Sequence, residues 1–180
     1  MAAARSQFVT VCRAEISVSC DGSKFGVDSS YRFAQVRDLT TVVTDRSGAP
    51  LLRVVGADEQ WREPISLDNM GEWIAAATIA AEDERFWHHM GVDPIAVARA
   101  IGQDLSAGKV VSGASTITMQ VARMCDPRAR SLSAKAVQAF RAMQLERALT
   151  KRSILEHYLN MAPYGGNLRG VQAAAQRYFG

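Results

Sequence analysis

Helix-starting and helix-ending residues divide the chain beyond residue 65 into a succession of amphipathic segments, and this pattern limits the fold more than any other feature. Asp93 followed by Pro94 is typical of a helix start, because the aspartate caps backbone N–H groups and proline fits the first turn. Gly108 is typical of the matching end. Apolar residues recur at helical spacing within each segment, which predicts a mainly α-helical domain.

The expected helices run from Ser66 or Asp68 through Ala81, from Pro94 to Gly108, from Ser115 or Thr116 through Met124, from about Leu132 to Leu149, from Thr150 through Leu159, and from Leu168 through Tyr178. We expect Ile101 and Leu105 of the second helix to face a core. The helix that starts near Leu132 is apolar or alanine on most of its circumference, so we expect it to be buried in the middle of the domain. Cys125 is expected to be a small buried residue.

A β-hairpin is predicted before these helices. Two β-branched runs, at residues 41–44 and 51–55, flank a turn that contains glycine and proline. Residues 1–38 show no sustained period of either kind and form an unassigned N-terminal segment. The predicted division is therefore 1–38 and 39–180, and everything after the hairpin is expected to be helical.

The composition is that of one globular domain. The chain has 180 residues, of which 48% are hydrophobic and 22% are charged, and this balance excludes wholesale disorder. The net charge of +3 suits a phosphate or an anionic membrane surface but is too small to indicate a nucleic-acid partner. The cysteines and histidines show no metal-ligand spacing, so no metal ligand is assigned. We find neither the apolar stretch of a membrane span nor a secretory signal pattern.

Residues 81–91 end an alanine-rich helix with three acids, two aromatic residues and two histidines. Carboxylates are disfavoured at the negative end of a helix dipole, and aromatic residues packed around a carboxylate would desolvate it, as suits a general base. Glu82 is the leading candidate for that base. The alternative is a solvated acidic helix end with Phe86 and Trp87 as core anchors, and composition alone favours it.

In residues 112–123, a turn that contains glycine is followed by the start of a helix, and this start carries hydroxyl side chains. Ser115, Thr116 and Gln120, with the backbone N–H groups of that start, could hold phosphate or sugar oxygens, although a plain N-cap explains the hydroxyls equally well. A group of cations follows, with Gln138 one turn beyond its last member: Arg123, Arg128, Arg130 and Lys135. Such a group could clamp a pyrophosphate, and its alternative is a run of solvated charges.

Two further acids lie on helices that are otherwise rich in apolar residues. We expect Glu146 and Glu156 to be paired structural groups rather than catalysts, because a buried charge needs a partner.

Taken in order, these segments resemble the glycosyltransferase family 51 domain of bifunctional penicillin-binding proteins. The resemblance covers roughly Thr41 to Gly180 and rests on the hairpin turn Asp45-Arg-Ser-Gly, Glu82-Asp-Glu-Arg-Phe-Trp-His-His-Met-Gly, Gly113-Ala-Ser-Thr-Ile-Thr-Met-Gln, Lys135 with Gln138, Lys151-Arg-Ser-Ile-Leu-Glu-His-Tyr-Leu-Asn, and Tyr164-Gly-Gly-Asn with Tyr178-Phe-Gly. Met119, Gln138 and the segment Ala162-Pro-Tyr-Gly-Gly are similar to the 1C type of these proteins.

The resemblance implies a lysozyme-like helical fold and the polymerisation of lipid II into glycan strands. It implies that Glu82 is the base, that Asp83 acts beside it, and that Asp83 and His89 orient this motif. The substrate-binding residues that it implies are His89, Ser115, Thr116, Gln120 and Gln138, with Arg123, Arg130 and Lys135 on the pyrophosphate. It requires no cofactor and allows a divalent cation, Mg²⁺ or Mn²⁺.

The implied partners are lipid II, the nascent glycan strand and a membrane surface, at the outer face of the bacterial cytoplasmic membrane. Family members carry further helices and a transpeptidase domain beyond the Tyr-Phe-Gly motif, which here ends at Gly180. We therefore expect a partial glycosyltransferase domain. Two alternatives stay open: an inactive fragment that only binds lipid-linked glycan, and a lysozyme-like lytic enzyme, which would need no pyrophosphate clamp.

Overall fold

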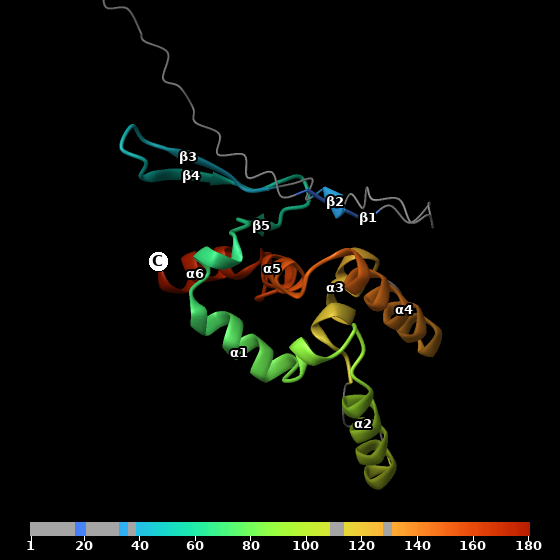
Figure 1. Cartoon of the computed structure of the whole chain (residues 1–180). Helices are drawn as coiled ribbons and strands as arrows, with labels where there is room; N and C mark the ends of the chain where they lie inside the picture. The colour runs from blue at the N-terminus through green and yellow to red at the C-terminus, as the bar shows by residue number, and fades with distance from the viewer. Residues whose placement is uncertain (1–16, 21–32, 36–38, 109–113, 128–130) are drawn as a thin grey trace, which may run out of the picture.

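The computed structural model describes residues 17–20, 33–35, 39–108, 114–127 and 131–180. Helices dominate this part of the chain, and the strands form small two-stranded sheets. The predicted mainly helical fold with a preceding hairpin is confirmed (Figure 1).

The described strands are β1 (Ser17–Cys20), β2 (Phe33–Gln35), β3 (Thr41–Thr44), β4 (Pro50–Val54), β5 (Trp61–Arg62) and β6 (Leu168–Arg169). The helices are α1 (Glu72–Glu82), α2 (Pro94–Ala107), α3 (Ile117–Cys125), α4 (Leu132–Ala148), α5 (Lys151–Met161) and α6 (Val171–Phe179), with short 3-10 turns at Leu67–Asn69 and Phe86–His88. Each predicted helix therefore exists, and α2, α3 and α5 begin at a predicted cap residue. The last helix begins at Val171 and not at Leu168, which lies in β6.

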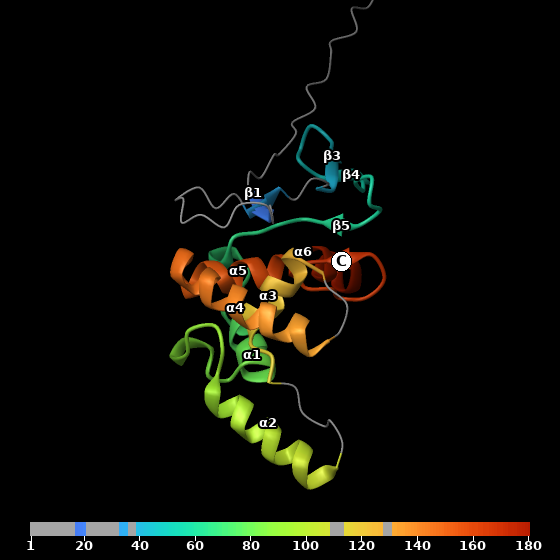
Figure 2. The same cartoon turned by 90° about the vertical axis from the view of Figure 1, so that its right-hand side faces the viewer.

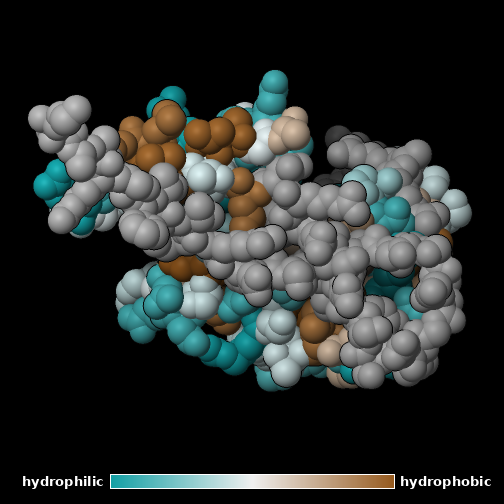
Figure 3. Space-filling view, turned by 90° about the horizontal axis from the view of Figure 1, so that it is seen from above, coloured by the Kyte–Doolittle hydropathy of each residue, from teal (hydrophilic) through white to brown (hydrophobic). Residues whose placement is uncertain are grey.

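The hairpin β3–β4 is antiparallel, and its turn is organised by one carboxylate. Oδ1 of Asp45 accepts hydrogen bonds from the backbone N–H groups of Ser47 and Ala49. Seen from above, hydrophobic residues gather on the side of the molecule where Figure 1 shows the hairpin (Figure 3). The exposed apolar residues of this hairpin and its exit are Leu51, Leu52, Val54 and Val55.

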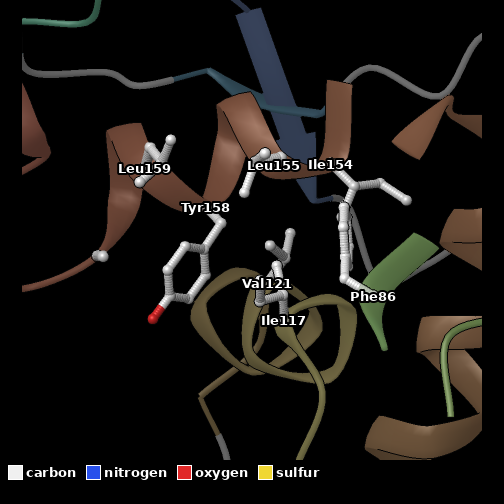
Figure 4. Close-up of a cluster of buried hydrophobic side chains, with 8 residues drawn as sticks. Phe86, Ile117, Val121, Ile154, Leu155, Tyr158 and Leu159 are labelled. Carbon is white, nitrogen blue, oxygen red and sulfur yellow. The ribbon is translucent and has the colours of Figure 1, made fainter. Parts of the chain in front are cut away.

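The core lies where α3 and α5 pack against each other, close to the turn that follows α1 (Figure 4). Its members are Phe86, Ile117, Val121, Ile154, Leu155, Tyr158, Leu159 and Ala162. Removing such side chains from water supplies most of the folding free energy, so this cluster fixes the position of α3 relative to α5. Cys125 packs against the cluster but is only half-buried.

Three expectations from the sequence were wrong in part. The first helix begins at Glu72, not at Ser66 or Asp68, because the 3-10 turn at 67–69 and Gly71, with φ +75°, intervene. The helix α4 is buried on one face only, through small residues such as Ala142, whereas Phe140 is 53% exposed. The two residues of α2 that were expected to face a core do not: Ile101 is 55% and Leu105 78% exposed.

The expectation that everything beyond the hairpin is helical was also wrong. The strand β5 pairs in parallel with β6, although more than 100 residues separate them. Nearby, Asn160 of α5 accepts from the backbone N–H of Ile65 through Oδ1 and donates to its carbonyl through Nδ2, at 2.9 and 2.8 Å. An asparagine side chain thus takes the place of a neighbouring strand for this residue.

None of the helices in the described ranges combines the length and the apolar character that crossing a membrane requires.

Candidate active site

Glu82 is the last residue of α1, and its carboxylate is exposed. Nε2 of Gln120 on α3 donates to its Oε2 at 2.7 Å, while the described residues offer no hydrogen bond to its other oxygen. The expected aromatic enclosure of Glu82 is wrong: Phe86 is fully buried in the core instead, and Trp87 is 48% exposed. The carboxylate is therefore accessible to a substrate hydroxyl and restrained on one side.

Asp83, the residue after Glu82, forms a buried hydrogen-bonded pair with His89, the Asp83–His89 pair. Both of its oxygens lie 3.0 Å from Nε2 of His89, and Oδ2 also accepts from the backbone N–H of Ile117 at 2.9 Å. The Gly91 N–H donates to Nδ1 of His89, so the ring proton is on Nε2 and points at the carboxylate. Asp83 and His89 thus hold the end of α1 against the start of α3, and both side chains are buried.

Thr116 and Ser115 lie at the start of α3 in different surroundings. The Thr116 side chain is 2% exposed; its hydroxyl donates to the Gly91 carbonyl and accepts from the Met119 N–H, as an N-cap does. Ser115 is half-buried, and its Oγ accepts from Nζ of Lys135 at 2.8 Å. The structure therefore brings Lys135 of α4 to the start of α3, while the Thr116 hydroxyl is occupied by backbone groups.

Arg123 lies one turn beyond Gln120 on α3, on the same side of the helix, and is exposed. Its charge and that of Glu82 both act on Tyr158 of α5. Burial, and after it the negative charge of Glu82 and the neighbouring Tyr164, raise the pKa of Tyr158, Arg123 lowers it, and the net pKa is about 12. Burial, followed by the Glu82 charge, also raises the pKa of Tyr164. These groups form one electrostatic cluster.

The two tyrosines were not among the predicted site residues. The helical period of α5 assigned Tyr158 to the core, and Tyr164 belonged to a motif without a role. A sequence signal existed, since a tyrosine combines an apolar ring with a polar tip and can serve a core and a site together.

For the remaining predicted site residues, no hydrogen bond to the groups above lies within the part of the chain that the structure describes. Arg128 and Arg130 lie outside the described residues. Gln138 is half-buried on α4, one turn beyond Lys135. The divalent cation stays a prediction. Among the described residues we find no group of three or more His, Cys, Asp or Glu side chains that could hold a metal ion by themselves.

Glu146 and Glu156 both have partners in the structure, so the predicted pairing of these two acids is confirmed. Oε1 of Glu146 accepts from Thr118 at 2.6 Å and from Nζ of Lys151 at 2.7 Å. The same ammonium group lies 4.4 Å from the centre of the Phe86 ring. Glu156 accepts from the backbone N–H of Leu67 at 2.8 Å.

Comparison with known proteins decides the family. Residues 47–180 match the family model described as transglycosylase. The chain belongs to the transglycosylase family. It is 48% identical over 139 residues to penicillin-binding protein 1C of Escherichia coli K12, covering 77% of this chain and 18% of that protein. With penicillin-binding protein 1A of the same organism the identity is 40% over 171 residues, covering 88% of this chain and 20% of the relative.

Penicillin-binding protein 1A of Aquifex aeolicus gives the same result: it is 43% identical over 122 residues, covering 67% of this chain and 17% of that protein. This transglycosylase chain spans about a fifth of the length of these relatives. The predicted family and the likeness to the 1C type are confirmed, and by family the domain is a peptidoglycan glycosyltransferase of cell-wall synthesis. The division at residues 38 and 39 stays a prediction.

Proposed function

We propose that this transglycosylase chain polymerises lipid II, with Glu82 as the base. Glu82 takes the proton from the 4-hydroxyl of the acceptor GlcNAc as that oxygen bonds to the anomeric carbon of the lipid-linked donor MurNAc. The bond from that carbon to the pyrophosphate breaks, the α linkage becomes β, and undecaprenyl pyrophosphate leaves. The observation that carries the proposal is the exposed Glu82 carboxylate, which accepts a hydrogen bond from Gln120. Arg123 lies one helical turn beyond Gln120 on the same helix.

Negative charge develops on the leaving pyrophosphate, and cations stabilise it there. We assign this role to Arg123 and Lys135, together with the predicted Arg130. Support comes from the two described cations: Arg123 is exposed near Glu82 and Tyr158, and Lys135 is held at the start of α3 by Ser115. Gln138 carries no charge, so the mechanism relies on one carboxylate and not on a pair.

The buried Asp83–His89 pair positions the base and does not contact the substrate. Because Asp83 also accepts from the Ile117 N–H, it ties the residue beside the base to the helix that carries Gln120 and Arg123. The distance between base and cation then depends on packing and not on mobile side chains alone.

The test is polymerisation of labelled lipid II in detergent by the purified chain, with a moenomycin-type inhibitor as a check. We expect glycan strands from the wild type and a loss of at least about 100-fold in Glu82→Gln, which keeps the shape and removes the base. Glu84→Gln, an exposed acid two residues away, is the matched control and should retain activity. A folded wild-type chain that forms no strands, or a fully active Glu82→Gln, would contradict the proposal.

A further inference from the structure

Tyr158 belongs to two environments. Its ring lies in the core among Ile117, Val121 and Leu155, and the residue as a whole is 8% exposed. The close-up shows the phenol oxygen at the end of the ring that points away from the other labelled side chains (Figure 4). The ring is therefore fixed by packing, and the hydroxyl is presented at a defined point beyond the core.

The hydroxyl of a buried tyrosine normally has a hydrogen-bond partner. Within the described ranges, no hydrogen bond reaches the Tyr158 oxygen, and the only fully buried side-chain polar atoms without a partner belong to Arg85 and Gln176. The Tyr158 oxygen therefore reaches the molecular surface, where it can bind a group from outside the chain.

The point where it surfaces is the candidate active site. The Glu82 and Arg123 charges both act on the phenol, and these are the proposed base and one of the proposed leaving-group cations. Burial and the Glu82 charge keep the proton on the oxygen, with a pKa of about 12. At neutral pH the group is thus a neutral hydrogen-bond donor, which cannot compete with Glu82 for the substrate proton.

We propose that the Tyr158 hydroxyl is a substrate-binding group, which donates a hydrogen bond to a sugar oxygen at the junction of acceptor and donor. This inference rests on the proposed function. Because the charges of the base on α1 and of the leaving-group cation on α3 both act on this hydroxyl, we place it alongside the bond that forms and the bond that breaks. The rigid ring holds the sugar without an ordering cost when the substrate arrives.

The test is Tyr158→Phe, which removes one oxygen and keeps the ring in the core. We expect an unchanged melting temperature and about a tenfold loss in kcat/KM for lipid II polymerisation, the order expected for one lost neutral hydrogen bond. The matched control is Tyr178→Phe, because the Tyr178 hydroxyl donates to the Tyr164 carbonyl on an exposed part of α6. The control should keep kcat/KM within about twofold.

A second measurement keeps this inference separate from the proposed function. Binding of fluorescent lipid II to the chain is followed by anisotropy in the Glu82→Gln background, where turnover is at least about 100-fold slower. We expect Tyr158→Phe to weaken this binding about tenfold. If the wild type forms no glycan strands but Tyr158→Phe still weakens binding, the proposed activity fails and the Tyr158 contact stands. Unchanged binding and unchanged kcat/KM would overturn the Tyr158 contact alone.

Discussion

At the scale of single residues, Gly91 is the position where the Asp83–His89 pair lies closest to α4. Its φ is +90°, in the region that favours glycine, and its N–H and carbonyl bond His89 and Thr116. A Cβ built at this position would lie 2.7 Å from the backbone carbon of Ala142. The small size of Gly91 is therefore needed for both its conformation and its packing.

We predict that Gly91→Ala destabilises the chain by about 2 to 4 kcal/mol, the sum of the strain in a left-handed conformation and the clash with a helix backbone. Urea denaturation measures the change. Gly71→Ala is the matched control, because Gly71 also has a positive φ but nothing lies within 4 Å of its added Cβ. Equal losses in the two variants would show that packing against α4 contributes nothing.

The chemistry of individual residues was only partly predictable. Glu82 stood out because three acids at the end of one helix are unusual, and Glu146 and Glu156 because buried acids need partners. The accessible position of Glu82 and the outward hydroxyl of Tyr158 could not be predicted, since the direction of a side chain depends on how α1, α3 and α5 cross.

At the scale of elements, α2 is set apart from the other helices. Both views show it extending away from the bundle of α3, α4 and α5 (Figure 2). Its stability depends mainly on its ends: the Asp93 side chain accepts from the Ile95 N–H, Pro94 follows, and Gly108 closes the helix with φ +63°. A helix with little packing relies on such caps.

We therefore predict that Asp93→Ala weakens α2 by about 1 kcal/mol with little effect on global unfolding. Hydrogen exchange of the α2 amides should quicken about fivefold, while amides of α3 and α5 stay protected. Arg99→Ala, an exposed change on the same helix, is the control. A matching loss of protection in α3 would show that α2 unfolds only with the whole domain.

The same residue makes α2 sensitive to acid. Burial alone would raise the pKa of Asp93, but the N–H groups of Ala96 and Ile95 and the charge of Arg85 lower it below the ordinary 3.8. The charged form is thus favoured in the folded state. Its contribution is fully present above the unfolded pKa and is lost as the pH falls through the lower folded pKa. The difference between wild type and Asp93→Ala in α2 exchange should accordingly shrink below about pH 4.

Helix ends followed from local chemistry where a side chain caps them. Thr116, Ser131 and Thr150 each accept a hydrogen bond from an N–H in the first turn of their helix, as their residue types predict. The start of α1 did not follow, because Ser66 and Asp68 are also good cap residues. Neither the bond of the Leu67 N–H to the Glu156 carboxylate nor the positive φ of Gly71 could be predicted from local sequence.

At the scale of the whole molecule, residues 59–70 are held by groups from the other end of the described chain. Their partners lie on α5, β6 and the loop between them, and the contacts include Asn160 with Ile65, Asn167 with Glu59, and Arg169 with Gln60. These bonds close the domain around the core, since they join the segment before α1 to the segments after α4.

We predict that Asn160→Ala lowers the free energy of unfolding by about 2 to 4 kcal/mol, because both backbone groups of Ile65 lose their partner. The loss should appear in a single cooperative transition in thermal denaturation. Asn69→Ala removes an exposed side chain whose hydrogen bond goes to Ser66 in the same turn, and it should change stability by less than about 0.5 kcal/mol. Two separate transitions in the Asn160 variant would show that the closure is not coupled to the core.

Contacts between segments that are far apart in the chain are the part of this fold that the sequence patterns predict least. A two-residue strand has no period to detect, and the parallel pairing of β5 with β6 depends on where the helices between them lead the chain. The partial exposure of α4 has the same origin: alanine suits a buried or an exposed face, and the packing of α4 against α3 and Gly91 decides which face is covered.

The bond between Asn160 and Ile65 also sets an order of events during synthesis. Ile65 leaves the ribosome 95 residues before its partner. At translation rates of about 5 to 20 residues per second, it waits roughly 5 to 20 seconds for that partner. During this interval the segment before α1 has neither of its native neighbours, α5 and β6, and the exposed hairpin beside it is already made. The nascent chain is therefore most vulnerable to misassociation in the interval before α5 emerges.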